Sequence, residues 1–370
     1  MRRPGLRRGT QAVLALGALA ALGLLSSLPL HGCARSKYKP LPADSTSAMS
    51  VDSLEVAARD AQSQWDGGDT EGAAKLTARI VLADLRAHAE QTPGLEWGGR
   101  TSALLDSLNF GAEVQSDPCV MVVNFFSRSD PEKGSWPWLF YCGPRTIDAQ
   151  SIEGKGLKIV SVTARGLGAT AGADSAPPGV AALFGRRAAA GYQPLLMTWK
   201  RARDGHWTLD QTLGSDSLGA FGGGDFDRSD SGIVLTARTY RPTARFEECP
   251  TCPHVYHEVR LVWRGAGFQR LDERVLPSPY ATFVRFATAM ATDDRNTAGQ
   301  LVSDAHWVDE AERLEFNAQH GSWRVAPATD ENAREMVFLR GKQEAYRVTF
   351  TPRSGDWLID GIATTSTSIE

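Results

Sequence analysis

An apolar run near the N-terminus constrains this chain more than any other feature, because it sets the first residues apart from the folded body. Four arginines stand among the first eight residues, and a nearly unbroken apolar series follows from Ala12 to Leu30. A basic start followed by a short apolar core is typical of an export signal. A spanning helix needs about 20 apolar residues, and Ser26, Ser27 and Pro29 weaken the end of this run. We therefore favour an export signal over an uncleaved anchor.

The end of this run, Leu30–Cys33 (Leu-His-Gly-Cys), resembles the lipobox of bacterial lipoproteins. In that family the signal is cut before the cysteine, whose thiol receives a diacylglycerol. The resemblance implies a signal peptide at residues 1–32, a lipidated Cys33 and a body held at a membrane of the cell envelope, outside the cytoplasm. His31 departs from the family pattern, which usually has a small or hydroxylated residue there. The residue after the cysteine is Ala34 and not Asp. By resemblance to the sorting of lipoproteins in Gram-negative cells, this permits transfer to the outer membrane, which we therefore favour in such a cell.

The composition indicates a globular, mildly acidic body. The chain has 370 residues, of which 42% are hydrophobic and 22% charged, as in ordinary packed proteins. That length suffices for two or three domains with cores of their own. Lys and Arg total 40 against 43 Asp and Glu, and four of the arginines fall in the predicted signal. Because nucleic-acid binding needs a basic surface, we expect no nucleic acid among the partners.

Helical periodicity begins after a short tether. Residues 33–50 are rich in Pro, Ser and Lys, so we expect a flexible linker there. Residues 51–116 are expected to be helical, with apolar residues on one stripe up to Trp65, a break at Gly67–Gly68 and a second helix capped by Asp69 or Thr70. The Trp-x-x-Gly-Asp turn loosely resembles a tetratricopeptide unit. Stacked repeats need about three units, so we favour a helical hairpin packed on the next domain over a peptide-binding groove.

Residues 117–275 are expected to form an antiparallel β-rich domain. Short β-branched and aromatic runs alternate with turn residues, and no convincing helix separates them. Such a series is typical of an antiparallel sheet, a sandwich or a partial barrel. The sequence also indicates a turn at Gly222–Gly224 and a long loop over Ala169–Ala182. The predicted strands cover residues 120–126, 136–142, 157–162, 194–201, 206–213, 233–240 and 255–263.

Four cysteines remain if Cys33 carries lipid, and an even number suits an exported protein whose thiols oxidise. Cys119 and Cys142 flank a strand-loop-strand unit, so we predict a disulfide between them. Cys249 and Cys252 are then expected to form the second disulfide. A zinc site with neighbouring histidines and a redox-active pair are the alternatives for this second pair, although we commit to no metal site.

Two further motifs are weak. Gly166–Ala171 matches the loose dinucleotide-binding pattern, but Pro177 and Pro178 follow where that pattern requires a helix. We therefore predict no bound cofactor. Asp225–Asp230 could offer carboxylates to calcium and faintly resembles the opening of calcium-binding propeller blades, but it lacks the spaced ligands of an EF-hand loop. A solvated turn is the favoured interpretation of this segment.

Residues 276–370 are expected to form a separate α+β domain after Leu276–Pro279. Apolar residues at helical spacing come first, and alternating strands follow, ending in Trp-Leu-Ile-Asp-Gly-Ile at 357–362. This order resembles the nuclear transport factor 2-like superfamily, in which a curved, cone-shaped sheet wraps a helix and leaves a cavity. Some members are enzymes with an Asp–His pair in that cavity. Asp304 and His306 stand only two positions apart, which on a helix would not place them on one face, so we expect no such pair.

The predicted fold class is α+β, with an N-terminal helical hairpin segment, a central antiparallel β-rich domain and a C-terminal cone-shaped α+β domain. No Gly-x-Ser-x-Gly, His-Glu-x-x-His or phosphate loop occurs, so we predict no catalytic residues. The leading hypothesis is a non-catalytic envelope lipoprotein that binds an envelope protein or a small-molecule ligand and contacts the membrane through its lipid. The alternatives are an enzyme or receptor that uses the C-terminal cavity, and metal or thiol chemistry at Cys249 and Cys252.

Overall fold

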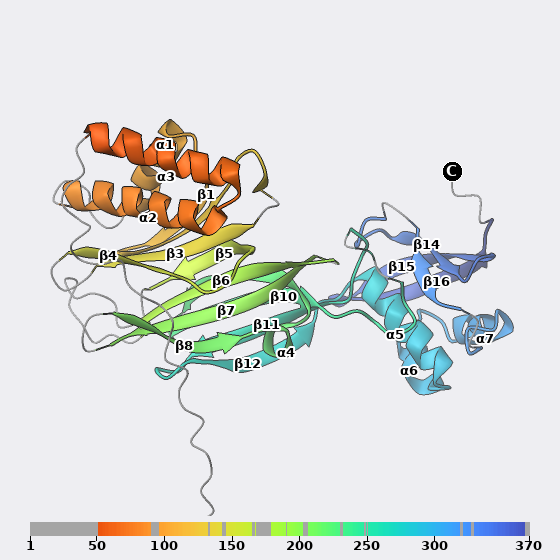
Figure 1. Cartoon of the computed structure of the whole chain (residues 1–370). Coiled ribbons are helices and arrows are strands. Elements are labelled where there is room, and N and C mark those ends of the chain that lie inside the picture. Colours follow the sequence, from red (N-terminus) through yellow and green to blue (C-terminus); the bar gives the residue numbers. More distant parts are fainter. Residues whose placement is uncertain are drawn as a thin grey trace, which may run out of the picture. The chain divides into compact units, whose positions relative to one another are not determined.

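Figure 1 shows the computed structural model of the chain. It describes residues 51–366 apart from short gaps, so the predicted signal peptide, the tether and Cys33 lie outside the described residues. No helix in this part of the chain is both long enough and apolar enough to cross a bilayer. The gaps are residues 90–95, 132–133, 143–145, 165–166, 168–178, 190, 203–205, 230–231, 248, 250, 319–320 and 327–328.

Three helices open the described chain: α1 (Val51–Gly67), α2 (Thr70–Ala87) and α3 (Trp97–Ser107). The start of α2 is set by Asp69, whose side chain accepts a hydrogen bond from the Gly72 backbone N–H at 3.0 Å. Such a cap satisfies one of the free N–H groups in the first turn of a helix. The helical hairpin expected from the sequence is therefore present, with its break at the predicted glycines.

An ion pair joins α3 to α2. Two guanidinium nitrogens of Arg100 lie 2.6 Å from the two carboxylate oxygens of Asp84, and the Asp84 side chain is only 9% exposed. The hydrogen bond to Asp84 raises the pKa of Arg100 above its ordinary value. Two parallel N–H···O bonds compensate the loss of water around a buried carboxylate. This pair holds the third helix at a defined angle to the second.

Strands β1 to β12 form three sheets of four antiparallel strands each within the described part of the chain. In every sheet the strands lie in the order of the sequence, so each sheet is a simple meander. The first sheet comprises β1 (Gly111–Asp117), β2 (Val120–Phe126), β3 (Ser135–Cys142) and β4 (Ile147–Ser151). The second comprises β5 (Leu157–Thr163), β6 (Gly179–Ala188), β7 (Gly191–Arg201) and β8 (Trp207–Leu213). After the short helix α4 (Ser215–Leu218), the third comprises β9 (Phe221–Ser229), β10 (Gly232–Tyr240), β11 (Tyr256–Trp263) and β12 (Phe268–Val275).

The helices and the three sheets are stacked in layers (Figure 1). In β2, Met121, Val123 and Phe125 belong to the core shared with the helices. The alternate residues Val120 and Val122 belong to the core shared with the second sheet. Because both faces of this strand are buried, its sequence is apolar except for Asn124 and does not alternate with polar residues.

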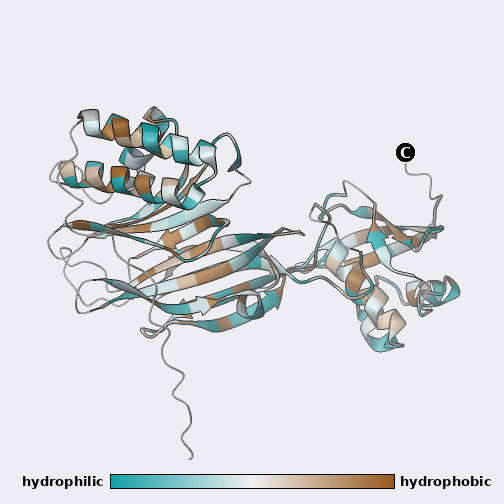
Figure 2. Ribbon diagram, viewed as in Figure 1, coloured by the Kyte–Doolittle hydropathy of each residue, from teal (hydrophilic) through white to brown (hydrophobic). Residues whose placement is uncertain are grey.

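The second sheet is buried on both faces in the same way. Val180, Ala182 and Phe184 of β6 pack toward the first sheet, whereas Ala181 and Leu183 pack toward the third. Figure 2 shows the resulting apolar bands across the sheets. Burying a side chain as large as Phe184 contributes roughly 1.5–3 kcal/mol, so the interior of the stack supplies much of the stability of this region.

The structure corrects several expectations for these strands. The range expected to be helical, residues 51–116, ends in strand β1. Gly222–Gly224, predicted as a turn, lies inside β9, as do Asp225 and Asp227 of the predicted solvated turn. A Cβ at either end of the Gly222–Gly224 series would collide with the backbone of β10. These glycines therefore permit close strand pairing and do not reverse the chain.

Other expectations fall partly outside the described residues. The predicted loop Ala169–Ala182 overlaps the start of β6, so its last residues are strand and not loop. The dinucleotide-like segment Gly166–Ala171 lies outside the described residues except for Leu167, which is buried in the core. Strands β1, β4, β6, β9 and β12 were not among those predicted from the sequence.

The C-terminal region places three helices before a four-stranded antiparallel sheet. The helices are α5 (Pro279–Ala291), α6 (Arg295–Gln300) and α7 (His306–Arg313). The strands, in their order across the sheet, are β13 (Trp323–Val325), β14 (Glu335–Arg340), β15 (Glu344–Arg353) and β16 (Asp356–Thr364). With its mixture of helices and antiparallel sheets, the described chain belongs to the α+β class.

Aromatic side chains fill the space between α5 and this last sheet. Phe283 of α5 stacks on Phe338 of β14 with ring centroids 3.6 Å apart, and it meets Trp323 edge-on at 5.1 Å. Arg340 is only 3% exposed, lies near three aromatic rings and forms an ion pair with Glu344. The interior of the C-terminal region is thus a packed aromatic core with one compensated charge.

Candidate functional site

Four cationic side chains line a pocket where the first and second sheets meet. They are Lys155, Lys158, Arg186 and Arg187, all exposed, and we call this site the basic pocket. Its volume of about 440 Å³ falls within the roughly 300–1,000 Å³ of small-molecule sites. Glu113 is the one carboxylate among its described lining residues, so the lining carries an excess of positive charge.

Strand pairing brings these cations together from separate parts of the chain. In the β5–β6 ladder, Lys158 pairs with Gly185, the residue before Arg186. In the β6–β7 ladder, Arg187 pairs with Tyr192. The fourth cation stands in the turn that enters β5, where the flanking glycines have φ values of 139° and 74°. The positions of three of the four charges are therefore fixed by the register of a buried sheet.

The floor of the basic pocket is polar and hydrogen-bonded. Glu113 accepts hydrogen bonds at Oε2 from the Ile159 backbone N–H at 3.1 Å and from Asn124 Nδ2 at 3.3 Å. Asn124 is 2% exposed and also donates to the Leu157 carbonyl oxygen at 2.6 Å. A carboxylate offers about four acceptor positions, so Glu113 keeps acceptor capacity at its other oxygen. These bonds tie β1 and β2 to β5 and hold the carboxylate in one place.

Tyr192 forms an aromatic wall of the basic pocket. A Cβ on Gly185 would stand 3.1 Å from Tyr192 Cβ and 3.2 Å from Cδ1, so the glycine gives the ring room to lie against β6. Lys158 Nζ is 5.5 Å from the ring centroid, a cation–π distance. Tyr192 nevertheless remains 43% exposed, which leaves ring surface open to a ligand.

These features suit the binding of an anion. Arg guanidinium groups match the geometry of carboxylate and phosphate oxygens, and Lys supplies a compact positive charge. A concave site lined by charge of one sign also raises the local concentration of ligands of the opposite sign. The fixed carboxylate and the open aromatic ring add a hydrogen-bond acceptor and an apolar face to the same site.

A second pocket, of about 510 Å³, lies against α5 in the C-terminal region. It is lined by residues 243–246, the last turns of α5 and the aromatic side chains of Phe316 and Trp323. Arg245 is the one charged side chain among its described lining residues. Most of its described lining residues are apolar, and the polar side chains among them are Arg245 and three threonines, Thr243, Thr288 and Thr292.

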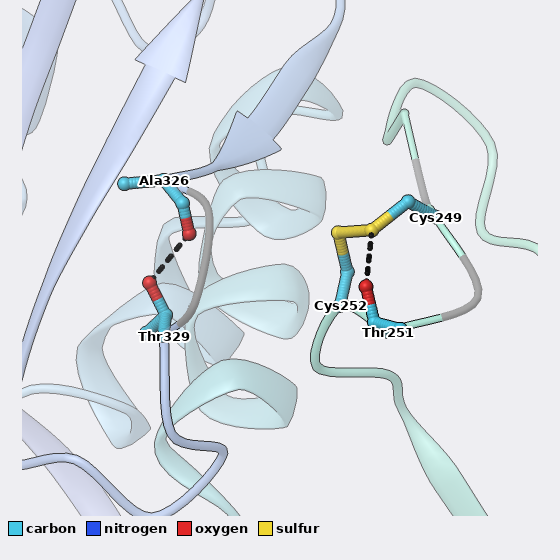
Figure 3. The surroundings of a disulfide bond; sticks show 5 residues. All are labelled: Cys249, Thr251, Cys252, Ala326 and Thr329. Atoms are coloured by element: carbon cyan, nitrogen blue, oxygen red, sulfur yellow. Dashed lines mark hydrogen bonds between the residues drawn. A yellow bond between two sulfur atoms is a disulfide. The ribbon is translucent and has the colours of Figure 1, made fainter. Parts of the chain in front are cut away.

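Both disulfides expected from the sequence are present, each with Cα atoms 5.1 Å apart. Cys119 and Cys142 join the ends of the β2–β3 hairpin, where the Cys142 N–H donates to the Cys119 carbonyl oxygen at 3.0 Å. In the Cys249–Cys252 turn, the Thr251 hydroxyl lies 3.6 Å from Cys249 Sγ (Figure 3). A disulfide sulfur carries no proton, so the hydroxyl is the donor.

The histidines that follow this turn are engaged elsewhere. His254 is 2% exposed and stacks on Tyr240 with centroids 3.6 Å apart. His257 Nδ1 lies 3.1 Å from a carboxylate oxygen of Glu273 on the neighbouring strand. Among the described residues, no group of three or more His, Cys, Asp or Glu side chains could hold a metal ion. The geometry therefore gives the zinc alternative at Cys249 and Cys252 no support.

Asp304 and His306 do meet, contrary to the expectation from helical spacing. His306 Nδ1 lies 2.8 Å from Asp304 Oδ1, and the His306 backbone N–H donates to the same oxygen at 2.9 Å. The two can meet because Asp304 precedes α7 and is not part of it. The backbone hydrogen bond, together with the His306 side chain, lowers the pKa of Asp304. Both side chains are more than half exposed, so this is a surface pair outside both pockets.

Comparisons with known protein families, with curated proteins and with solved structures found no match. The candidate site therefore rests on its own geometry. Sequence reasoning missed the four cations because they belong to two segments about 30 residues apart that only the β5–β6 pairing joins. The adjacent arginines Arg186 and Arg187 at the end of an apolar run were the one available signal.

Proposed function

We propose that this protein is a non-catalytic, lipid-anchored protein of the cell envelope that binds an anionic small molecule in the basic pocket. The observation that carries the proposal is the convergence of four cations on one concave site. A concave site lined mainly by positive charge raises the local concentration of ligands of the opposite sign. An anionic ligand is therefore the occupant that this lining favours.

The envelope location is supported by the sequence of the first 33 residues. The basic start, the apolar core and the Leu-His-Gly-Cys end together favour export and lipidation at Cys33. Two disulfides are consistent with a body that folds in an oxidising compartment. The outer membrane is the favoured address in a Gram-negative cell, because Ala34 follows the cysteine.

For the C-terminal region we propose the cone-shaped fold of the nuclear transport factor 2-like superfamily. Support comes from the order of its elements, in which α5 to α7 precede a four-stranded antiparallel sheet. Its aromatic core and mostly apolar pocket favour a structural or partner-binding role over catalysis. We place ligand binding in the basic pocket for this reason.

Titration with inorganic phosphate tests the proposal. Replacing the four cations by Gln removes several charge-assisted hydrogen bonds of about 1.5–3 kcal/mol each, so phosphate affinity should fall at least about tenfold. A control with the same change in net charge replaces four exposed cations outside the pocket and should bind as the parent does. Equal phosphate affinities in all three proteins would contradict the proposal, and so would a parent protein that binds no anion. The control residues are Lys75, Arg324, Lys342 and Arg353.

A further inference from the structure

We infer that the ligand of the basic pocket is an anionic sugar, a hexose that carries a phosphate or carboxylate group. This inference rests on the proposed function and adds the chemical class of the ligand. It depends on three kinds of group that line the same pocket: the four cations, the fixed carboxylate of Glu113 and the open ring of Tyr192.

Each kind of group matches one part of such a molecule. The cations bind the phosphate or carboxylate through charge-assisted hydrogen bonds. Glu113 has no proton to donate when ionised, so it selects hydroxyl groups, which can donate to it. Tyr192, 43% exposed, offers a rigid apolar face to the C–H surface of a sugar ring. A carboxylate in an anion site would repel a bare anion, and its presence is explained if the ligand also brings donors.

The size of the basic pocket also favours an organic ligand over an inorganic ion. Its volume is about 440 Å³, whereas one water occupies roughly 30 Å³ of liquid. A phosphate ion replaces only a few waters, so most of the pocket would stay filled with solvent. A hexose phosphate fills more of it and displaces water from the ring of Tyr192.

A nucleotide is the closest competitor, because it also joins a phosphate to a sugar and adds a planar base that could stack on Tyr192. The exposed face of Tyr192 could take either a base or a sugar, so the ring alone does not separate the two ligands. Glu113 favours a ligand rich in hydroxyl donors. Adenosine monophosphate is therefore included in the test as a competing probe.

The test compares the affinities of the parent protein for glucose 6-phosphate, glucuronate, galacturonate, adenosine monophosphate, glucose, acetate and inorganic phosphate. Either glucose 6-phosphate should bind about tenfold or more tightly than inorganic phosphate, or one of the two uronates should bind about tenfold or more tightly than acetate. Neutral glucose should bind far more weakly than that anionic hexose. Tyr192→Ala should reduce hexose affinity about fivefold more than it reduces phosphate affinity, because only the hexose packs on the ring. Leu271→Ala, which removes an equally exposed apolar side chain outside the pocket, should change neither.

The outcomes separate this inference from the proposed function. If the parent binds phosphate but no anionic hexose more tightly than its bare anion, the sugar inference is overturned and anion binding stands. If adenosine monophosphate binds more tightly than every hexose and depends on Tyr192, a nucleotide replaces the sugar. If no anion binds at all, both the inference and the proposed function fail.

Discussion

Replacing Gly222 by Ala should destabilise the central region far more than the same replacement at its neighbour Gly223. Gly222 has φ of 127°, which L side chains rarely adopt, and a Cβ there would collide with the carbonyl oxygen of Arg238 and stand 2.8 Å from the Thr239 Cα. At Gly223 a Cβ would meet only a Val160 methyl, at 3.8 Å. The two positions are adjacent in β9, so they form a matched pair.

The magnitude follows from two effects. Overpacking against a fixed backbone costs about 1–3 kcal/mol, and a side chain forced into a glycine-only conformation costs about 1–3 kcal/mol more. Gly222→Ala should therefore lower the free energy of unfolding by about 2–6 kcal/mol. Gly223→Ala should leave it unchanged or raise it by up to about 1 kcal/mol, because alanine restricts the unfolded chain.

Urea unfolding of a chain that begins at residue 34, followed by tryptophan fluorescence, measures the difference. For an m-value of about 2 kcal/mol/M, the midpoint of Gly222→Ala should lie about 1 M or more below that of Gly223→Ala. If the two midpoints agree within error, the close approach of β9 to β10 is wrong, and with it the reason for three successive glycines in a strand.

Three further predictions concern the covalent and electrostatic supports of the fold. Replacing both Cys119 and Cys142 by Ala should lower the free energy of unfolding by roughly 3 kcal/mol, because the disulfide restricts the unfolded chain by closing a loop with a sequence separation of 23. An unchanged urea midpoint would count against this disulfide. Burial raises the pKa of Tyr346 to about 12, so its contribution to stability is complete below pH 10 and is lost as the pH rises toward 12. Tyr346→Phe should flatten that alkaline decline in a series of thermal melts, and a variant with the parent's slope would refute the assignment. Arg100→Met leaves the carboxylate of Asp84 with only the His88 ring nitrogen, 3.3 Å away, and should cost about 2 kcal/mol, less than for a fully buried pair because the Arg side chain is 31% exposed. Adding Asp84→Leu should recover most of that loss in urea unfolding, and no recovery would contradict the ion pair.

The sequence predicts those helices and strands whose local residue pattern matches the burial that the fold gives them. Strand β2 is apolar apart from Asn124 because both of its faces are buried, and its predicted range, 120–126, matches the structure. The break between α1 and α2 was also foreseen, because Gly67–Gly68 cannot continue a helix well and Asp69 caps the next one.

The strands that were not predicted have residue patterns that are not typical of β-strands. Strand β6 begins after a Pro-rich stretch and contains small residues such as Ala181 and Ala182, which lack strong β propensity. Strand β12 is polar along most of its length because it lies at the edge of its sheet. Burial between the neighbouring sheets decides the case of β6, and pairing with β11 decides that of β12. No local window of sequence contains either influence.

The basic pocket could not be predicted because its parts meet only through β6. Without that strand, the arginines Arg186 and Arg187 have no defined position relative to Lys155 and Lys158. The carboxylate of Glu113 was hidden for a related reason, since β1 falls in a range whose neighbours are helical. Long-range pairing thus creates a site whose residues are unremarkable one by one.

Mass spectrometry of the mature N-terminus tests the central claim, that this folded body is held at a membrane outside the cytoplasm by a lipid on one residue. The account predicts an N-terminal peptide that begins at Cys33 and carries the added mass of a diacylglycerol on its sulfur, with none of residues 1–32 retained. A mature chain that begins elsewhere, or one that begins at Cys33 with an unmodified thiol, would contradict it.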